Sequence, residues 1–211
     1  MKKLLIAFFA VAFLPLAANA AKYEEGTHYF VVPGQPTNSP EVREYFSYYC
    51  PHCRSFESYL GEIESSLPNG TKLKKTHVDF MGQSSPEIQT MLSTGLAIAE
   101  KTGLAKQFNA EAFSYIQTKR QPITSLDDVR KIYIAAGGDG ATFDKGTKGF
   151  AIRGQVKRNK KEQDKLSRGR YLKSVPTLVV NGKYLINNKE LDPKNFVQDY
   201  KALIAYLLTL D

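Results

Sequence analysis

The only two cysteines of this 211-residue chain lie in the stretch Cys50-Pro51-His52-Cys53. A disulfide between them would close almost no loop, so it would restrict the unfolded chain little and add little stability. A closely spaced thiol pair is instead typical of a redox centre that alternates between dithiol and disulfide. The spacing therefore predicts thiol–disulfide exchange at this site.

The surroundings of the pair predict which cysteine reacts. An aromatic, strand-like stretch precedes Cys50, and a helical pattern begins at Pro51, a residue that the first helical position accepts. Free backbone N–H groups and the helix dipole favour a thiolate on Cys50, and His52 can stabilise it as a donor or a cation. Because the thiolate exists only in the reduced protein, its stabilisation makes the disulfide form an oxidant. Cys53 should be buried and act as the internal partner.

Two other uses of the cysteines fit the sequence less well. A structural zinc site needs about four ligands, which the cysteines would have to share with His28, His52 and His77. A purely structural disulfide would gain little. We expect no metal and no bound cofactor, because the dithiol itself carries the electrons, and we expect His28 and His77 to be structural.

The first twenty residues have the pattern of a secretory signal peptide. Lys2 and Lys3 precede an apolar run over 4–16, and the small residues at 18–20 form a cleavage site, so the mature chain should begin at Ala21. The apolar run is too short to span a membrane comfortably. A disulfide that must cycle fits an oxidising compartment, and the bacterial periplasm fits best. We therefore expect an exported, soluble protein.

The formal net charge of +8 is concentrated in residues 157–173, which have eight lysine and arginine residues against two acidic ones. A solvated helix face is the simpler interpretation of this segment. If its end runs towards the active-site loop, it would favour acidic substrates or an anionic membrane surface. No motif for nucleic-acid binding accompanies it.

Hydrophobic periodicity predicts strands towards both ends of the chain and helices between them. Strands are expected over residues 27–32, 41–48, 72–80, 177–180 and 183–186. Helices are expected over residues 51–66, 86–102, 104–118, 125–136, 142–165 and after 192–193. This order predicts an α/β protein, a thioredoxin-like fold with an inserted helical domain. The expected division is a signal peptide over 1–20, a core in two parts over 21–82 and 166–211, and a helical insertion over 83–165.

A second signal is Val175-Pro176, directly before the strand over 177–180. Proline here fits a tight turn with a cis bond, or an ordinary strand start with a trans bond. In the inferred fold the pair lies beside Cys50, where the backbone of Val175 could bind an extended substrate segment by strand addition. Asn181-Gly182 follows between apolar runs, which is a strong signal for a two-residue hairpin.

Glu44 is a candidate proton carrier. The strand over 41–48 alternates, so Glu44 shares a face with Val42 and Phe46. A carboxylate buried beneath the dithiol could take the proton of Cys53.

Together these stretches resemble the DsbA family of periplasmic thiol:disulfide oxidoreductases. The resemblance rests on residues 44–53, 56–57, 77–82, 175–177 and 180–184, which cover both halves of the core. It implies that Cys50 is an exposed nucleophile, Cys53 a buried thiol and Pro176 a cis-proline. It also implies that Glu44, Glu57 and Lys75 are charged groups near the active site, although Glu57 and Lys75 could equally be solvated surface charges.

The family pattern further implies partners for the chain. Reduced exported polypeptides would be the substrates, and a DsbB-like membrane protein would reoxidise the cysteine pair with quinone. Two features depart from the family: the chain has no tryptophan, and Ser174 precedes Val175-Pro176 where glycine is expected.

The sequence thus predicts an enzyme that introduces disulfide bonds into exported proteins through Cys50 and Cys53, with a monomer favoured. Three alternatives stay open. One is a disulfide isomerase or reductase, although such proteins usually add a dimerisation domain for which no segment remains. The second is a chaperone-like binding protein whose cysteines are incidental, and the third is an oxidase with a narrow acidic client.

Overall fold

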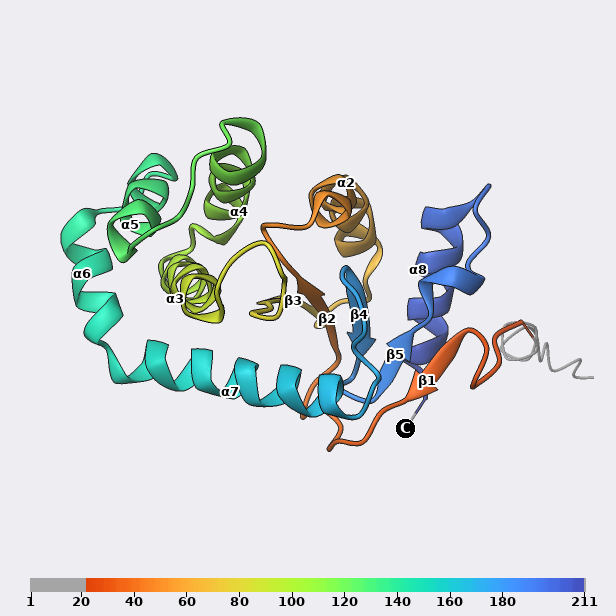
Figure 1. Ribbon diagram of the computed structural model, residues 1–211. Coiled ribbons are helices and arrows are strands. Elements are labelled where there is room, and N and C mark those ends of the chain that lie inside the picture. The colour runs from red at the N-terminus through yellow and green to blue at the C-terminus, as the bar shows by residue number, and fades with distance from the viewer. Residues whose placement is uncertain (1–21, 211) are drawn as a thin grey trace, which may run out of the picture.

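The computed structural model describes residues 22–210 as a five-stranded sheet with helices on both of its faces (Figure 1). The strands are β1 (Tyr29–Val31), β2 (Glu41–Phe46), β3 (Lys72–His77), β4 (Thr177–Val180) and β5 (Tyr184–Ile186), in the spatial order β1-β5-β4-β2-β3. β2 and β3 are parallel, and the other neighbouring strands are antiparallel. The sheet joins both ends of the chain, as a thioredoxin-like fold requires. The expected signal peptide lies outside the described residues.

Helices α2 (Pro51–Ser66) and α8 (Phe196–Leu207) cover one face of the sheet and contact each other (Figure 1). The last helix, expected after residues 192–193, buries an apolar stripe in which Tyr200, Leu203 and Leu207 are fully buried. α2 begins and ends where the sequence predicts, with Pro51 in its first turn. These two helices fix the end of β2 from which the cysteine pair extends.

The helical insertion occupies the other face. It consists of α3 (Pro86–Thr102), α4 (Ala105–Phe113), α5 (Leu126–Ala135), α6 (Gly140–Lys148) and α7 (Phe150–Arg168). The prediction of one helix over 142–165 is wrong, because Gly149 takes an extended conformation and separates α6 from α7. The predicted helix over 104–118 also changes character, since α4 passes into a π-helical turn over Ser114–Thr118.

The predicted hairpin is confirmed, but its loop has three residues where the sequence predicts two. Asn181 and Gly182 both have positive φ, at 51° and 67°, as this kind of tight turn requires. Pairing resumes between Val180 and Tyr184, so three residues separate the paired positions. A short 3₁₀ helix (Asn188–Glu190) then leads towards α8.

Buried apolar side chains form two clusters on the two faces of the sheet. Alternation along β4 shows this, because Val179 belongs to one cluster while Leu178 and Val180 belong to the other. The insertion-side cluster joins the end of β2 and both cysteines to the insertion, and includes Phe46, Tyr48, Cys50, Cys53, Leu92, Phe108, Val129 and Ile152. The α2–α8 cluster includes Phe56, Leu60, Ile63, Leu178, Tyr200, Leu203 and Leu207. None of the described helices is long and apolar enough to cross a membrane.

Candidate active site

Cys50 is the N-cap of α2. Its Sγ accepts a hydrogen bond from the backbone N–H of Cys53 over 3.3 Å. This places the sulfur where the first N–H groups of the helix point outward, an arrangement that stabilises a negative charge. Both cysteines carry free thiols in this structure.

Access to Cys50 is narrower than the family resemblance implies. The residue is only 5 % exposed, so the expectation of an exposed nucleophile is wrong in its simple form. The thiol opens into a groove of about 690 Å³, between the turn at Pro51 and His52, the loop after β3 and the segment before β4. Pro51 and His52 are themselves exposed at the rim. A substrate must therefore enter this groove before it can reach the sulfur.

Val175-Pro176 lies beside Cys50, and its peptide bond is cis, as one of the two interpretations of the sequence held. The Cys50 thiol donates to the carbonyl oxygen of Val175 over 3.4 Å. The carbonyl of Pro176 accepts from the side chain of Asn188 over 3.0 Å. In this reduced form the Val175 carbonyl is thus already occupied by the thiol, and a bound segment would compete for it.

Cys53 is fully buried. Burial raises the pKa of its thiol, because the surrounding apolar side chains disfavour the thiolate. The two sulfurs therefore differ in environment: Cys50 lies at a helix terminus beside a groove, while Cys53 lies inside the insertion-side cluster. This agrees with the division of roles that the sequence predicts.

A charged cluster lies beneath the pair. Lys75 Nζ contacts Glu44 Oε2 and Glu57 Oε1, each at 2.5 Å. Glu44 is fully buried, and its burial raises the pKa of the carboxyl to about 7, although Lys75 acts in the opposite direction. The side chains of Lys75 and Glu57 are 14 % and 32 % exposed, so neither is a freely solvated surface charge. The second oxygen of Glu44, Oε1, has no hydrogen-bond partner among the described residues.

The insertion contributes a contact that the sequence does not reveal. The side chain of Gln117, in the π-helical turn, donates to the carbonyl oxygens of Tyr48 and Cys50 over 2.7 and 3.0 Å. π-Helical turns often occur at functional sites. No spacing rule links Gln117 to a cysteine 67 residues away, so only the tertiary structure brings them together.

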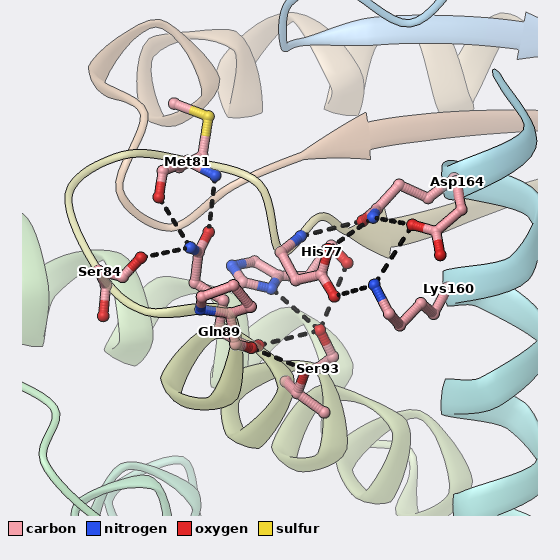
Figure 2. A network of polar contacts seen from close by, with 11 residues as sticks. His77, Met81, Ser84, Gln89, Ser93, Lys160 and Asp164 are labelled. Atoms are coloured by element: carbon pink, nitrogen blue, oxygen red, sulfur yellow. Dashed lines mark hydrogen bonds and ion pairs between the residues drawn. The ribbon is translucent and has the colours of Figure 1, made fainter. Parts of the chain in front are cut away.

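Figure 2 shows a second set of contacts between the insertion and the core. The buried side chain of Gln89 donates to the carbonyl oxygens of Met81 and Ser84 and accepts from the Met81 N–H, over 2.8, 2.9 and 3.2 Å. From α7, Gln163 and Lys160 bind the carboxylate of Asp79. These contacts hold both ends of the loop whose residues Phe80–Gln83 line the Cys50 groove.

His77 lies between the same two regions. Its ring stacks on Tyr48 with centroids 4.7 Å apart, and its Nδ1 lies 3.1 Å from Ser93 Oγ (Figure 2). Burial lowers the pKa of His77 to about 3, since the charged ring would lose its hydration. Within residues 22–210, no three His, Cys, Asp or Glu side chains are arranged to hold a metal ion.

Comparison with known proteins decides the family. The model of the DSBA-like thioredoxin domain matches residues 41–200. This chain belongs to the DsbA family. It is a thiol:disulfide oxidoreductase whose redox pair is Cys50 and Cys53, and its fold is the thioredoxin-like α/β fold with a helical insertion that the sequence predicts.

Relatives of known function support this assignment over the whole length. The chain is 33 % identical to the thiol:disulfide interchange protein DsbA of Salmonella typhimurium, covering 99 % of both chains. It is 34 % identical to DsbA of Escherichia coli K12, covering 98 % of each.

Solved structures agree. A complex of Proteus mirabilis DsbA with a non-covalently bound peptide superposes with a TM-score of 0.78 at 27 % identity, covering 89 % of this chain and 99 % of that one. DsbA of Klebsiella pneumoniae gives a TM-score of 0.77 at 26 % identity, covering 89 % and 98 %.

Proposed function

We propose that this protein is a dithiol oxidase that introduces disulfide bonds into exported polypeptides. A substrate thiolate attacks Sγ of Cys50 in the disulfide form, the Cys50–Cys53 bond breaks, and Cys53 leaves as a thiolate and takes up a proton. A second substrate thiolate then attacks the substrate sulfur of the mixed disulfide and releases Cys50 as a thiolate. Two electrons thereby pass from the substrate to the cysteine pair.

The observation that carries this direction of electron flow is the position of the Cys50 sulfur. It caps the N-terminus of α2 and accepts the Cys53 N–H at 3.3 Å. This environment stabilises the leaving thiolate and hence the reduced form, which makes the disulfide the more oxidising partner. Pro51 starts the helix without an unpaired N–H, and the exposed His52 lines the same groove as the Cys50 thiol.

Glu44 acts as the proton carrier for Cys53. Its carboxyl has a pKa raised to about 7 by burial, so near neutral pH it can both accept and return a proton. Lys75 holds this carboxyl in place and balances its charge, and Glu57 in turn binds the Lys75 ammonium. The unpartnered oxygen of Glu44 leaves an acceptor available for that proton.

Val175 and Pro176 form the wall against which the substrate lies. The Cys50 thiol now donates a hydrogen bond to the Val175 carbonyl oxygen over 3.4 Å. A bound segment would displace the thiol and pair with that carbonyl by strand addition. The peptide PWATCDS bound to Proteus mirabilis DsbA contains a cysteine, which supports an extended, cysteine-containing segment as the substrate class.

The remaining partners and the location follow from this role. Reduced exported polypeptides are the substrates, a DsbB-like membrane quinone reductase restores the disulfide, and the protein works in the periplasm as a monomer after removal of residues 1–20. The core over 21–82 and 166–211 carries the thiol pair, and the insertion over 83–165 covers it. No cofactor takes part, since the cysteines carry the electrons.

The redox equilibrium of the purified protein with glutathione tests the direction. We expect a potential far more oxidising than that of thioredoxin. A reducing potential would overturn the proposal and favour a reductase.

The Cys50→Ser variant distinguishes an oxidase from a chaperone-like binding protein. If the protein is an oxidase, the variant should no longer oxidise a reduced substrate. If it is a binding protein, the variant should still suppress aggregation of an unfolded substrate.

A further inference from the structure

The basic segment of α7 builds a second groove, away from Cys50. A cavity of about 410 Å³ lies between the C-terminal half of α7 and the sheet, where the two run side by side (Figure 1). This volume is within the range of ordinary ligand sites. We call it the α7 groove. Its floor is apolar and consists of Tyr45, Leu166 and Val179. Its wall is cationic and consists of Arg158, Lys161 and Lys165.

The cations of the wall have no carboxylate partner in the part of the chain that the structure describes. Within residues 22–210, none of Arg158, Lys161 and Lys165 forms an ion pair, whereas the adjacent Lys160 binds Asp79 and Asp164. All three side chains are exposed at the mouth of the groove. A set of unpaired cations along one face of a helix raises the local concentration of anions.

The carboxylates at the groove do not cancel this charge. Glu41 lines it but is already bound by Arg43 and Lys74, at 2.7 and 2.6 Å. Glu162 also lines it, and is one carboxylate against the three free cations of the wall. The groove therefore keeps an excess of positive charge over an apolar floor.

The spacing of the cations indicates an extended ligand. Arg158 and Lys165 are seven positions apart, which corresponds to about 10 Å along a helix axis. In an extended polypeptide, alternate side chains lie about 7 Å apart on one face. Carboxylates at alternate positions could thus meet separate cations of the wall, while apolar side chains from the same segment cover Tyr45 and Val179.

We propose that the α7 groove binds an acidic, extended segment of a partner polypeptide, with glutamate or aspartate at alternate positions and apolar residues between them. A concave groove with an apolar floor fits an inserted segment better than a flat membrane surface. Binding here needs no thiol chemistry, so this site stands independently of the function of Cys50.

The absence of tryptophan from the chain allows a direct binding test. The probe is the peptide acetyl-Glu-Trp-Glu-Leu-Glu-amide, and its tryptophan emission is followed while the reduced protein without residues 1–20 is added. The matched probe has glutamine in place of each glutamate. We expect saturable binding of the acidic probe, at least about tenfold weaker binding of the glutamine probe, and a marked loss of affinity with added salt.

Two charge-matched variants make the test specific. Arg158→Gln/Lys161→Gln/Lys165→Gln removes the cationic wall, and Lys145→Gln/Lys148→Gln/Arg153→Gln removes three exposed charges from α6 and the start of α7 that do not line the groove. We expect the first variant to weaken binding of the acidic probe about tenfold and the second less than about twofold, since three exposed ion pairs together contribute about that much.

Three outcomes would overturn the proposal: no binding of the acidic probe, equal weakening by both variants, or equal affinity for the two probes. Sedimentation with phosphatidylglycerol vesicles tests whether the groove binds an anionic membrane instead of a peptide. Vesicle binding that depends on Arg158, Lys161 and Lys165, without binding of the peptide, would assign the groove to a membrane instead. Because all six substituted side chains are exposed, unchanged thermal unfolding is expected for both variants.

Discussion

The two faces of the sheet serve the thiol pair differently. On one face, the α2–α8 cluster holds the helix whose N-terminus activates Cys50, and it consists of core residues alone. On the other, the insertion-side cluster includes both cysteines, and the insertion adds amide contacts to the carbonyl of Cys50 and to the loop beside it. The core thus places the sulfur, and the insertion shapes and closes what surrounds it.

A matched pair of cavity-forming substitutions tests this difference most strongly. Leu92→Ala on the insertion side and Leu203→Ala on the other each remove a fully buried side chain, and each should cost about 3 kcal/mol of unfolding free energy. Only Leu92→Ala should also expose Cys53, because Leu92 shares a cluster with it. Urea unfolding measures the first effect, and alkylation of Cys53 in a Cys50→Ser background measures the second. Equal alkylation in both variants would contradict the division.

The His77 ring, on the insertion side, should contribute less stability in mild acid. His77 has a pKa lowered to about 3 in the folded protein, so the unfolded chain alone binds a proton between about pH 6.5 and pH 3. The stability that the neutral ring provides is present above pH 6.5 and is lost as the pH falls. From pH 7 to pH 5 this loss amounts to about 2 kcal/mol.

Asp199 provides the contrast on the other face. Burial disfavours its charged form, but the Lys22 ammonium and other donors offset this and lower the pKa of its carboxyl below 3.8. The stability that the ionised Asp199 carboxylate contributes is therefore retained down to that pH. Urea unfolding at pH 7 and pH 5 checks both statements. From pH 7 to pH 5, the unfolding free energy of His77→Phe should change by about 2 kcal/mol in the stabilising direction relative to that of the wild type, because the variant lacks the His77 loss. Asp199→Asn should change as the wild type does over this range. An unchanged slope in His77→Phe would contradict the assignment.

Glu44 belongs to the core side, and its effect on the reaction should appear in the rate at which the disulfide closes. Closure of the disulfide by Cys53 requires loss of a proton, so reoxidation by oxidised glutathione should accelerate as pH rises through about 7, where Glu44 ionises. Glu44→Gln should remove this inflection and slow reoxidation by roughly tenfold. Stopped-flow measurement from pH 5 to pH 9 decides the point, with Glu64→Gln, an exposed carboxylate on α2, as the control. A preserved inflection in Glu44→Gln would remove the residue from proton transfer.

The smallest expected effect concerns the loop that the insertion holds. Gln89→Leu removes three hydrogen bonds to Met81 and Ser84 and should let the wall of the Cys50 groove move. We expect KM for a reduced peptide substrate to rise about fivefold, because the groove is no longer preorganised. The glutathione redox equilibrium should not change. Thr90→Ala, on the same helix, should leave KM as in the wild type; a fall in kcat with unchanged KM in Gln89→Leu would show that the loop affects chemistry instead.

Local patterns allowed most of the fold to be predicted. The bounds of α2 and α3, the apolar stripe of α8 and the turn at Asn181-Gly182 depend on neighbouring residues, through periodicity, proline position and backbone conformation. The break at Gly149 was missed because the charge pattern of 142–165 continues across it. Gly149 itself leaves helical geometry, and a single glycine in a helical pattern does not reliably mark a helix end.

The sequence by itself determined the chemistry: two cysteines at this spacing, at the start of a helix, can act as a redox pair. The tertiary structure decided the access and the support. The narrow opening at Cys50, the position of Gln117 against its carbonyl and the pairing of Lys75 with two carboxylates all join residues far apart in the chain. Contacts of this kind depend on how the faces of the sheet are covered. Periodicity specifies which side of an element is buried, but not which partner buries it.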